Sequence, residues 1–183
     1  TEIPTTLKRQ NGSSRPWNLE SAEIRQACMA LKGSVLRREI YARDTSEEKD
    51  RPYSATEQNY TIELLQPEGP NKHAVFFAHP RESLDFHYER KLVTVNGNRR
   101  ADPRVSHTMT LEVDAFGNVL RSVAIGYRRR ALPALSEPEQ KQTHLTLTAS
   151  RFTNCPGQYD WYRVGLPIET RTFEIVKGPE PTI

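Results

Sequence analysis

The sequence predicts a mainly β fold, with an antiparallel sheet of about eight strands and one short amphipathic helix near the amino terminus. Short segments in which apolar and polar residues alternate recur along the chain, as expected of strands with one apolar and one polar face. Glycine, proline and asparagine separate these segments, and only one segment has apolar residues at helical spacing. The 183 residues are enough for one domain with a core, which we place at residues 17–177.

The predicted helix begins near Asn18 or Ser21 and ends at Gly33. Apolar or small residues recur there at helical spacing: Ile24, Ala27, Cys28 and Leu31. Asn18 and Ser21 are both suitable N-cap residues, and glycine commonly ends a helix. Because the apolar stripe is narrow, we expect the helix to cover one edge or end of a sheet. Residues 1–16 are polar and contain proline, glycine and serine, so they are predicted to form a linker or a strap on a neighbouring surface.

Alternation predicts eight strands after the helix. Their ranges are 34–43, 60–64, 74–78, 83–89, 108–114, 119–127, 145–149 and 168–176. The charged residues 44–52 form a predicted loop, and His-Pro-Arg at residues 79–81 a short reversal between two strands. Residues 95–103 are predicted as a loop, residues 128–141 as a mobile polar connection, and residues 178–183 as an extended tail.

The clearest strand pair is a long hairpin at residues 104–127. Its apolar residues alternate with polar ones on the first arm and share one side of the second: Met109, Leu111 and Val113, then Val119, Val123, Ile125 and Tyr127. Gly117 takes a positive φ at no steric cost and Asn118 tolerates the left-handed region, so the chain can reverse between the arms. The predicted structural residues are therefore Gly117 and Asn118 in the turn and Leu111, Val113, Val123 and Ile125 on the strands.

The composition is polar for a compact globule. Apolar residues make up 36% of the chain, and the mean hydropathy is -0.73. Long loops, and sheets with one face exposed to solvent, would both lower the apolar content, and we expect both. The 26 basic and 23 acidic residues are interleaved and give a net charge of +3, so no nucleic-acid partner is predicted. Short arginine runs at residues 37–38, 99–100 and 128–130 are interpreted as solvated surface.

Targeting signals and cysteines add little to this picture. No stretch approaches the ~20 apolar residues that a membrane-spanning helix needs, so no direct membrane insertion is predicted. The amino end lacks the apolar core of a secretory signal, and the absence of an initiator methionine suggests an excised or processed segment. Cys28 and Cys155 lack the spacing of a metal knuckle or a redox pair. We predict free thiols, with a long-range disulfide as the alternative.

Familiar catalytic and cofactor motifs are absent from the sequence. There is no Walker loop, GxGxxG, HExxH or GxSxG, so no enzyme activity, cofactor or metal is predicted. One alternative is a zinc- or manganese-dependent hydrolase with ligands on two adjacent strands: His73, His79, His87 and Asp85. Strand glutamates could also flank a glycosidic bond, but we interpret them as cross-strand partners of arginines. These are Glu63, Glu82, Glu89 and Glu112.

The densest aromatic cluster is Y-D-W-Y, which contains Tyr159, Trp161 and Tyr162. If exposed, these rings would be candidate ligand-binding residues for a glycan or a peptide, which is the alternative function. We interpret them instead as a plug at the end of a sheet or a contact with a neighbouring part of a parent protein.

Three motifs, in order along the chain, carry a resemblance to a known family. They are PYSATEQNYTI at residues 52–62, HAVFFAHPRESLDFHYER at residues 73–90 and LEVDAFGNVLRSVAIGY at residues 111–127. Together they resemble the middle/C-terminal region of the B component of bacterial insecticidal toxin complexes. The resemblance runs from about residues 22–37 to Arg130, with a weaker match in LPIETRTFEI near the end.

The resemblance implies a piece of a large protein, because the chain lacks the propeller and the run of Rhs repeats of that family. In the family the B component and a C-type component form a hollow β-sheet shell around a toxic payload. The implied function is therefore a non-catalytic structural segment of the shell. The implied partners are the remainder of the parent B component and a C-type toxin component, in a secreted or extracellular complex.

Overall fold

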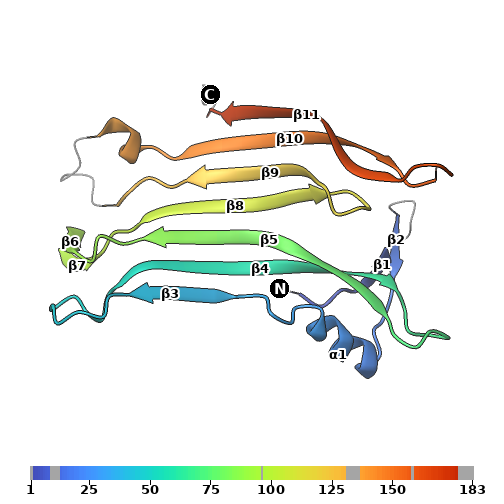
Figure 1. Cartoon of the computed structure of the whole chain (residues 1–183). Helices are drawn as coiled ribbons and strands as arrows, with labels where there is room; N and C mark the ends of the chain where they lie inside the picture. Colours follow the sequence, from blue (N-terminus) through green and yellow to red (C-terminus); the bar gives the residue numbers. More distant parts are fainter. Residues whose placement is uncertain (1, 9–12, 96, 131–136, 158, 177–183) are drawn as a thin grey trace, which may run out of the picture.

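The computed structural model describes residues 2–8, 13–95, 97–130, 137–157 and 159–176 (Figure 1). Its elements are β1 (Thr6–Lys8), β2 (Ser14–Pro16), α1 (Ser21–Met29), β3 (Arg37–Tyr41), β4 (Pro52–Gln66), β5 (Val75–His87), β6 (Leu92–Val95), β7 (Asn98–Ala101), β8 (Arg104–Val113), β9 (Val119–Gly126), the 3-10 helix η2 (Pro138–Lys141), β10 (His144–Cys155) and β11 (Arg163–Ile175). Nine strands form one sheet in the order β11-β10-β9-β8-β5-β4-β1-β2, with β3 also paired to β4. Pairing is antiparallel except between β1 and β4. The predicted fold class, mainly antiparallel β with one helix, is confirmed.

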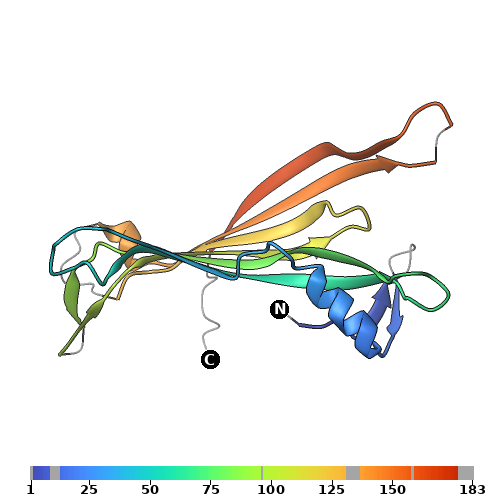
Figure 2. The same cartoon turned by 60° about the horizontal axis from the view of Figure 1, so that its bottom comes forward.

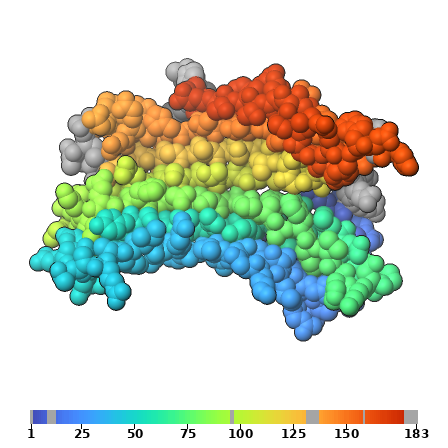
Figure 3. Space-filling view, in the orientation of Figure 1, coloured from blue at the N-terminus to red at the C-terminus, as the bar shows by residue number. Residues whose placement is uncertain are grey.

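The large sheet is a single layer. Seen after rotation, its strands form one curved layer, and α1 lies to one side at one end (Figure 2). The space-filling view shows the strands as consecutive bands across one broad face (Figure 3). The accessible surface is 13530 Å², about half as large again as the roughly 9,000 Å² expected of a compact protein of 21.0 kDa. Few apolar side chains of the described residues are buried: Leu7, Ala27, Ala55, Ile62, Leu64 and Val123.

The central part of this sheet has one apolar face and one polar face. The register places apolar side chains of β5, β8, β9, β10 and β11 side by side on what we call the apolar face: Leu84, Met109, Val123, Ile125, Leu145, Leu147, Phe173 and Ile175. The opposite face, which we call the hydroxyl face, carries rows of serine and threonine: Ser83, Thr108, Thr110, Ser122, Thr146, Thr148, Thr170 and Thr172. The expected division into one apolar and one polar face is present in this part of the sheet, as is common in antiparallel sheets, but the apolar face is also partly exposed.

Nearer to the end of the sheet where α1 lies, β-bulges in several strands interrupt the division into an apolar face and a hydroxyl face. The extra residues are Arg81 on β5, Leu111 on β8, Leu120 on β9 and Ile168 on β11. One extra residue shifts the alternation of side chains and moves the residues that follow to the opposite face. Beyond the bulges, Phe76 of β5 and Val113 of β8 therefore lie on the side of the hydroxyl face, where β4 places Ile62 and Leu64 by its uninterrupted alternation. The face of the sheet that carries the apolar side chains is thus different on the two sides of the bulges.

Strand β5 is continuous, so the predicted reversal at residues 79–81 is wrong. Pro80 pairs with Tyr60 next to the bulge at Arg81. Strand β8 pairs with β5 only at residues 82–87, so the missing N–H of Pro80 removes no hydrogen bond from that ladder. Because the bulge lies where the pairing of β5 with β8 ends, Pro80 can remain inside the long strand β5.

The helix α1 fastens the β4–β5 turn through a buried carboxylate. Glu20 is the N-cap, and a capping box joins it to Glu23. The Glu23 carboxylate accepts hydrogen bonds from the backbone N–H of Glu20 at 3.1 Å, the backbone N–H of Glu68 at 2.9 Å and Nε1 of Trp17 at 3.3 Å. Burial alone would raise the pKa of Glu23, but these hydrogen bonds outweigh it and lower the pKa.

The helix differs from its prediction in its cap and in its buried face. Neither Asn18 nor Ser21 is the N-cap, because the Glu20 carboxylate takes that role. Of the predicted apolar stripe only Ala27 is buried, whereas Ile24 and Cys28 are exposed. Polar contacts therefore hold the helix in place. With nine residues, α1 is too short to cross a membrane, and none of the described helices is long and apolar enough to do so.

Three other segments differ from the sequence-based expectation. The predicted linker or strap at residues 1–16 contributes the two short strands β1 and β2, and Leu7 of β1 pairs with Leu64 of β4. Part of the predicted loop at residues 95–103 belongs to the β6–β7 hairpin, which turns at Gly97 with φ +77°. Within the predicted connection at 128–141, η2 follows residues 131–136, which lie outside the described residues, as does the predicted tail.

Replacing Glu23 by alanine removes three hydrogen bonds to one carboxylate. We expect a loss of about 2 kcal/mol of local stability, which would speed exchange of the Glu68 amide hydrogen about thirtyfold. Glu47→Ala, in the exposed loop before β4, is the matched control and should leave this rate unchanged. Equal rates in the Glu23→Ala variant and the parent chain would contradict the role given to this carboxylate.

Candidate functional site

A cluster of polar side chains closes the β8–β9 turn at residues 114–118. Asp114 Oδ1 accepts hydrogen bonds from the backbone N–H groups of Phe116 and Asn118, each at 2.9 Å. Asp114 Oδ2 accepts from the side-chain Nδ2 atoms of Asn118 and Asn154, each at 2.9 Å. Burial alone would raise the pKa of Asp114, but these hydrogen bonds outweigh it and lower the pKa. We call Asp114, Asn118 and Asn154 the turn cluster.

The turn cluster links the β8–β9 hairpin to the β10–β11 hairpin. Asn154 Oδ1 accepts a hydrogen bond from the backbone N–H of Gly165 at 2.8 Å. A Cβ on Gly165, which has φ +73°, would lie 2.8 Å from Asn118 Oδ1. A Cβ on Gly117, which has φ +88°, would lie 3.0 Å from Phe77 Cζ on β5. The positive φ favours glycine at both positions, and a larger residue would also require Phe77 or Asn118 to move.

Both predicted turn residues belong to this site. Gly117 has the predicted positive φ. Asn118 acts through its side-chain amide and its backbone N–H, and its φ is not positive. The other members were not among the predicted site residues. Asp114 has a local signal, since it lies four residues before Asn118 in D-x-F-G-N, whereas Asn154 and Gly165 have none because they come from a different hairpin.

A buried ion pair lies at the opposite end of the strands. Arg129 Nε lies 3.3 Å from Asp102 Oδ2, and Arg129 Nη2 donates to the Asp102 backbone oxygen at 2.7 Å. Arg129 Nη1 donates to Glu89 Oε1 at 2.7 Å, and the Arg130 backbone N–H donates to Asp102 Oδ1 at 3.0 Å. These contacts join the segments that follow β5, β7 and β9. Removing Arg129 would take the cationic partner away from the buried Asp102 carboxylate, which destabilises this end of the strands.

A third polar contact fixes the loop before β4 against the segment after β5. Arg90, which has φ 58°, donates to Asp44 Oδ2 at 3.0 Å and to the Tyr53 hydroxyl at 3.1 Å. Its guanidinium also lies over the Tyr53 ring, 4.7 Å from the centroid. Hydrogen bonds from Arg90 and Ser46 lower the pKa of Asp44 to about 2.

The predicted strand residues do not all share one face. Val123, which is 7% exposed, and Ile125 lie on the apolar face. Leu111 is the extra residue of the β8 bulge and is 55% exposed. Val113 lies beyond that bulge, so the expectation that Met109, Leu111 and Val113 share a face is wrong.

A row of ion pairs borders the apolar face. Arg121 Nε lies 3.2 Å from Glu112 Oε2. Glu169 is shared by two arginines, with Arg151 Nη1 at 3.7 Å and Arg171 Nη2 at 2.7 Å. Because the pairs are largely exposed, each contributes about 0–1 kcal/mol, and their main effect is to give the apolar face a charged boundary.

The alternative metal site is not assembled. His79 and His87 are eight positions apart on the continuous strand β5, which separates them by roughly 26 Å. Asp85 accepts a hydrogen bond from Thr56 Oγ1 at 2.8 Å. In the parts of the chain that the structure describes, no three metal-ligating side chains come together, and His73 is not joined to the other histidines. The hypothesis of a metal-dependent hydrolase is therefore wrong for these residues.

The four glutamates considered as strand residues each have a side-chain partner, and the two cysteines are free thiols. The glutamates are held as follows: Glu63 by Lys8, Glu82 by Asn59, Glu89 by Arg129 and Glu112 by Arg121. Of these four pairs, Glu112 with Arg121 is the cross-strand glutamate–arginine pair that the interpretation proposed, whereas Glu89 and Arg129 both lie outside the strands. Cys28 and Cys155 are both free, as predicted.

The aromatic cluster is exposed on the loop between β10 and β11. Tyr159 is fully exposed, Tyr162 is 69% exposed and Trp161 is 47% exposed. The Arg163 guanidinium lies 5.8 Å from the Trp161 ring centroid. The rings therefore do not plug the end of the sheet. Their role as candidate ligand-binding residues stays a prediction.

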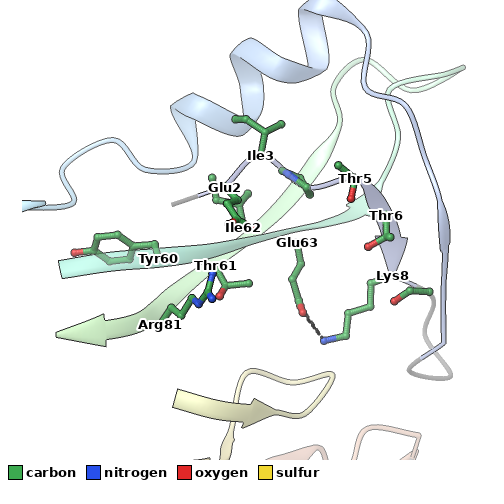
Figure 4. A pocket seen from close by; sticks show the side chains of 12 residues that line it. Glu2, Ile3, Thr5, Thr6, Lys8, Tyr60, Thr61, Ile62, Glu63 and Arg81 are labelled. Carbon is green, nitrogen blue, oxygen red and sulfur yellow. Dashed lines mark hydrogen bonds and ion pairs between the residues drawn. The ribbon is translucent and has the colours of Figure 1, made fainter. Parts of the chain in front are cut away.

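A polar cavity of about 240 Å³ lies beside β1 and β4 (Figure 4). Its lining includes Thr6, Thr61, Arg81 and the ion pair between Lys8 Nζ and Glu63 at 2.8 Å. The lysine and the glutamate neutralise each other, and the described lining contains no histidine, cysteine or aspartate. The remaining polar groups of the described lining are mainly hydroxyl groups, including those of Ser14, Tyr60 and Thr61.

Similar proteins are found by sequence and by structure. The sequence model of the family described as "Insecticide toxin TcdB middle/C-terminal region" matches residues 26–166. The structure of the Photorhabdus luminescens Tc holotoxin pore with a mutant TccC3 is similar, with 27% identity and a TM-score of 0.74 over 93% of this chain and 8% of that chain. Crystal structures of TcdB2-TccC3-Cdc42 and TcdB2-TccC3 each give 28% identity and a TM-score of 0.72, over 93% and 92% of this chain and 8% of theirs. No curated protein matches.

The chain forms one large β-sheet, its polar side chains have structural roles, and the proteins similar to it belong to toxin complexes. It is therefore a structural β-sheet segment of a toxin complex. The chain belongs to the family of the insecticide toxin TcdB middle/C-terminal region. The resemblance carried by the three sequence motifs is thereby confirmed. The chain spans about 8% of the length of the solved chains that it matches.

Gly117→Ala should lower the local stability of the β8–β9 hairpin by about 2 kcal/mol, because the residue has a positive φ and its Cβ would meet Phe77. Gly126→Ala is the matched control, since no atom lies within 4 Å of its added Cβ, and should change stability by less than about 0.5 kcal/mol. Amide exchange of β8 and β9 measures both. Equal effects of the two substitutions would refute the close contact.

The lowered pKa of Asp114 predicts how the turn cluster responds to acid. The hydrogen bonds to the carboxylate stabilise the fold above the unfolded pKa of about 3.9, and this contribution is lost as the pH falls through the lower folded pKa. The side-chain amide signal of Asn154 should therefore keep its NMR position down to about pH 4 and change below it. The Asp114→Asn variant should lack this transition. A midpoint above the unfolded value would show that the carboxylate is not stabilised.

Proposed function

We propose that this chain is a non-catalytic section of the β-sheet wall of a shell that encloses a toxic payload. The observation that carries the proposal is the single-layer sheet, which presents two broad faces of different chemistry (Figure 2). A single layer separates one space from another, whereas a domain that is stable on its own usually packs two or more layers around a core.

Exposed apolar surface supports a place inside a larger assembly. On the apolar face Phe173 is 47% exposed and Ile175 is 45% exposed. Contiguous apolar patches on a free monomer normally mark contact sites or cause aggregation. The small share of the matched chains that this chain spans also supports the proposal, since most of such a protein would lie outside these residues.

Side-chain chemistry supports a structural role. The carboxylates of Glu23, Asp102 and Asp114 each accept hydrogen bonds from two or more donors, and each joins separate segments of the chain. Carboxylates held in this way fix the ends of hairpins and are poorly suited to exchange protons with a substrate.

The proposed partners are the remainder of a parent B component and a C-type toxin component. Complexes of TcdB2 with TccC3 are among the similar solved structures, which supports this assignment. The complex would act outside the producing cell as a secreted toxin. Neither nucleic acid nor direct membrane insertion is part of the proposal.

Thiol labelling on both sides of β10 tests the wall directly. In a complete complex with Cys28 and Cys155 replaced by serine, single cysteines are placed at Leu147 on the apolar face and at Thr148 on the hydroxyl face. A wall around a water-filled space predicts that a small maleimide labels both positions. A maleimide on a large polymer should label only one position until the complex is unfolded.

Two results would contradict the wall. Labelling of both positions by the large polymer would mean that neither face is enclosed. Failure of the small maleimide at one position would mean that this face packs against a solid core.

A further inference from the structure

The large sheet ends at β11 on one side and at β3 and the three-residue strand β2 on the other, and these edges differ in how they are protected. Strand β3 has only five residues, and its charged side chains bond to one another and to β4. Arg37 pairs with Glu39 and Glu57, and the Tyr41 hydroxyl donates to Glu39 at 2.7 Å. A short edge strand covered with charged side chains discourages the addition of another strand.

Strand β11 is a longer and more regular edge. Its first part is interrupted by Pro167 and by the bulge at Ile168, but residues 169–175 pair with β10 without a shift in register. No described strand pairs with the outer side of β11. In an antiparallel ladder alternate residues direct their N–H and C=O groups away from the partner strand. Residues 169–175 therefore present a row of unpaired backbone groups.

Rows of side chains that cross the apolar face end at this edge. One row runs from Ile125 through Leu145 to Ile175. The next row runs from Met109 through Val123 and Leu147 to Phe173. Both rows end in a large apolar side chain that is almost half exposed. A strand added to β11 would cover these side chains if it carried apolar residues opposite them.

The third row ends in a positive charge. It runs from Glu112 through Arg121 and Ala149 to Arg171. Arg171 shares its acidic partner Glu169 with Arg151, so two arginines meet one carboxylate. An acidic residue opposite Arg171 would balance this excess.

We propose that residues 169–175 of β11 are a docking edge for one further β-strand from the longer protein that carries this chain. The docked strand has two apolar residues, two positions apart, opposite Phe173 and Ile175, and an acidic residue two positions further, opposite Arg171. This assignment rests on the proposed wall, in which the sheet continues beyond these residues. It also makes β11, and not β3, the edge at which the sheet is extended.

Amide hydrogen exchange in the complete complex tests the docking edge. A docked strand predicts that all amides of residues 169–175 exchange as slowly as those of the interior strand β9. A free edge predicts alternation, because every second amide would face water. Alternating fast and slow exchange along β11 would overturn the proposal.

A pair of charge reversals tests the predicted acidic residue. Arg171→Glu should speed exchange at residues 169–175 about tenfold, because two carboxylates would then face each other across the new pair. Arg151→Glu is the matched control: it lies on β10 directly opposite Glu169, so its effect should be confined to amides near residue 169 and should leave the protection of residues 173–175 in place. Equal effects of the two substitutions would overturn the acidic assignment.

The two proposals fail in different ways. Fast alternating exchange at β11 together with one-sided polymer labelling at residues 147 and 148 would remove the docking edge and keep the wall. Slow exchange at β11 together with labelling of both faces would keep the edge and remove the wall. Protection that disappears on dilution of the complex would identify a second copy as the occupant and would overturn the assignment to the same protein.

Discussion

The backbone ladder of one extended sheet is the interaction on which the rest of this structure depends. Because the sheet has no second layer among the described residues, its side chains are mostly half exposed and only six apolar side chains are buried. Hydrogen bonds between strands and cross-strand pairs must then provide the order that a packed core provides elsewhere. Such a sheet is well suited to be one part of a larger surface and poorly suited to be a separate domain.

Three carboxylates show how the ends of this sheet are fixed. Glu23 holds the β4–β5 turn against α1, Asp114 holds the β8–β9 turn against β10, and Asp102 holds the segments after β7 and β9 together. Each carboxylate accepts backbone N–H groups that would otherwise lack a partner, a use of charge that favours rigidity. The bulges act differently, because they change which face of the sheet is apolar without interrupting most of the strand pairing.

The sequence predicted those features that depend on neighbouring residues. Period-two alternation located the β8–β9 hairpin, and Gly117 located its turn. Alternation failed at Pro80 and at Leu111, where a bulge shifts the pattern by one residue and only the partner strand shows where the extra residue lies. The N-cap was also predicted wrongly, at Asn18 or Ser21, because a glutamate in this position is unusual. The contacts of Asn154 and Gly165 could not be predicted, since they join hairpins far apart in the sequence.

Equilibrium unfolding of the 183-residue chain by itself, combined with its mass in solution, shows whether the single-layer sheet is stable without neighbouring parts of a larger protein. If the single layer must be completed by neighbouring parts of a larger protein, the isolated chain should associate or unfold without a cooperative transition. A monomer that unfolds cooperatively with about 5–15 kcal/mol, the range of ordinary independent domains, would contradict the claim.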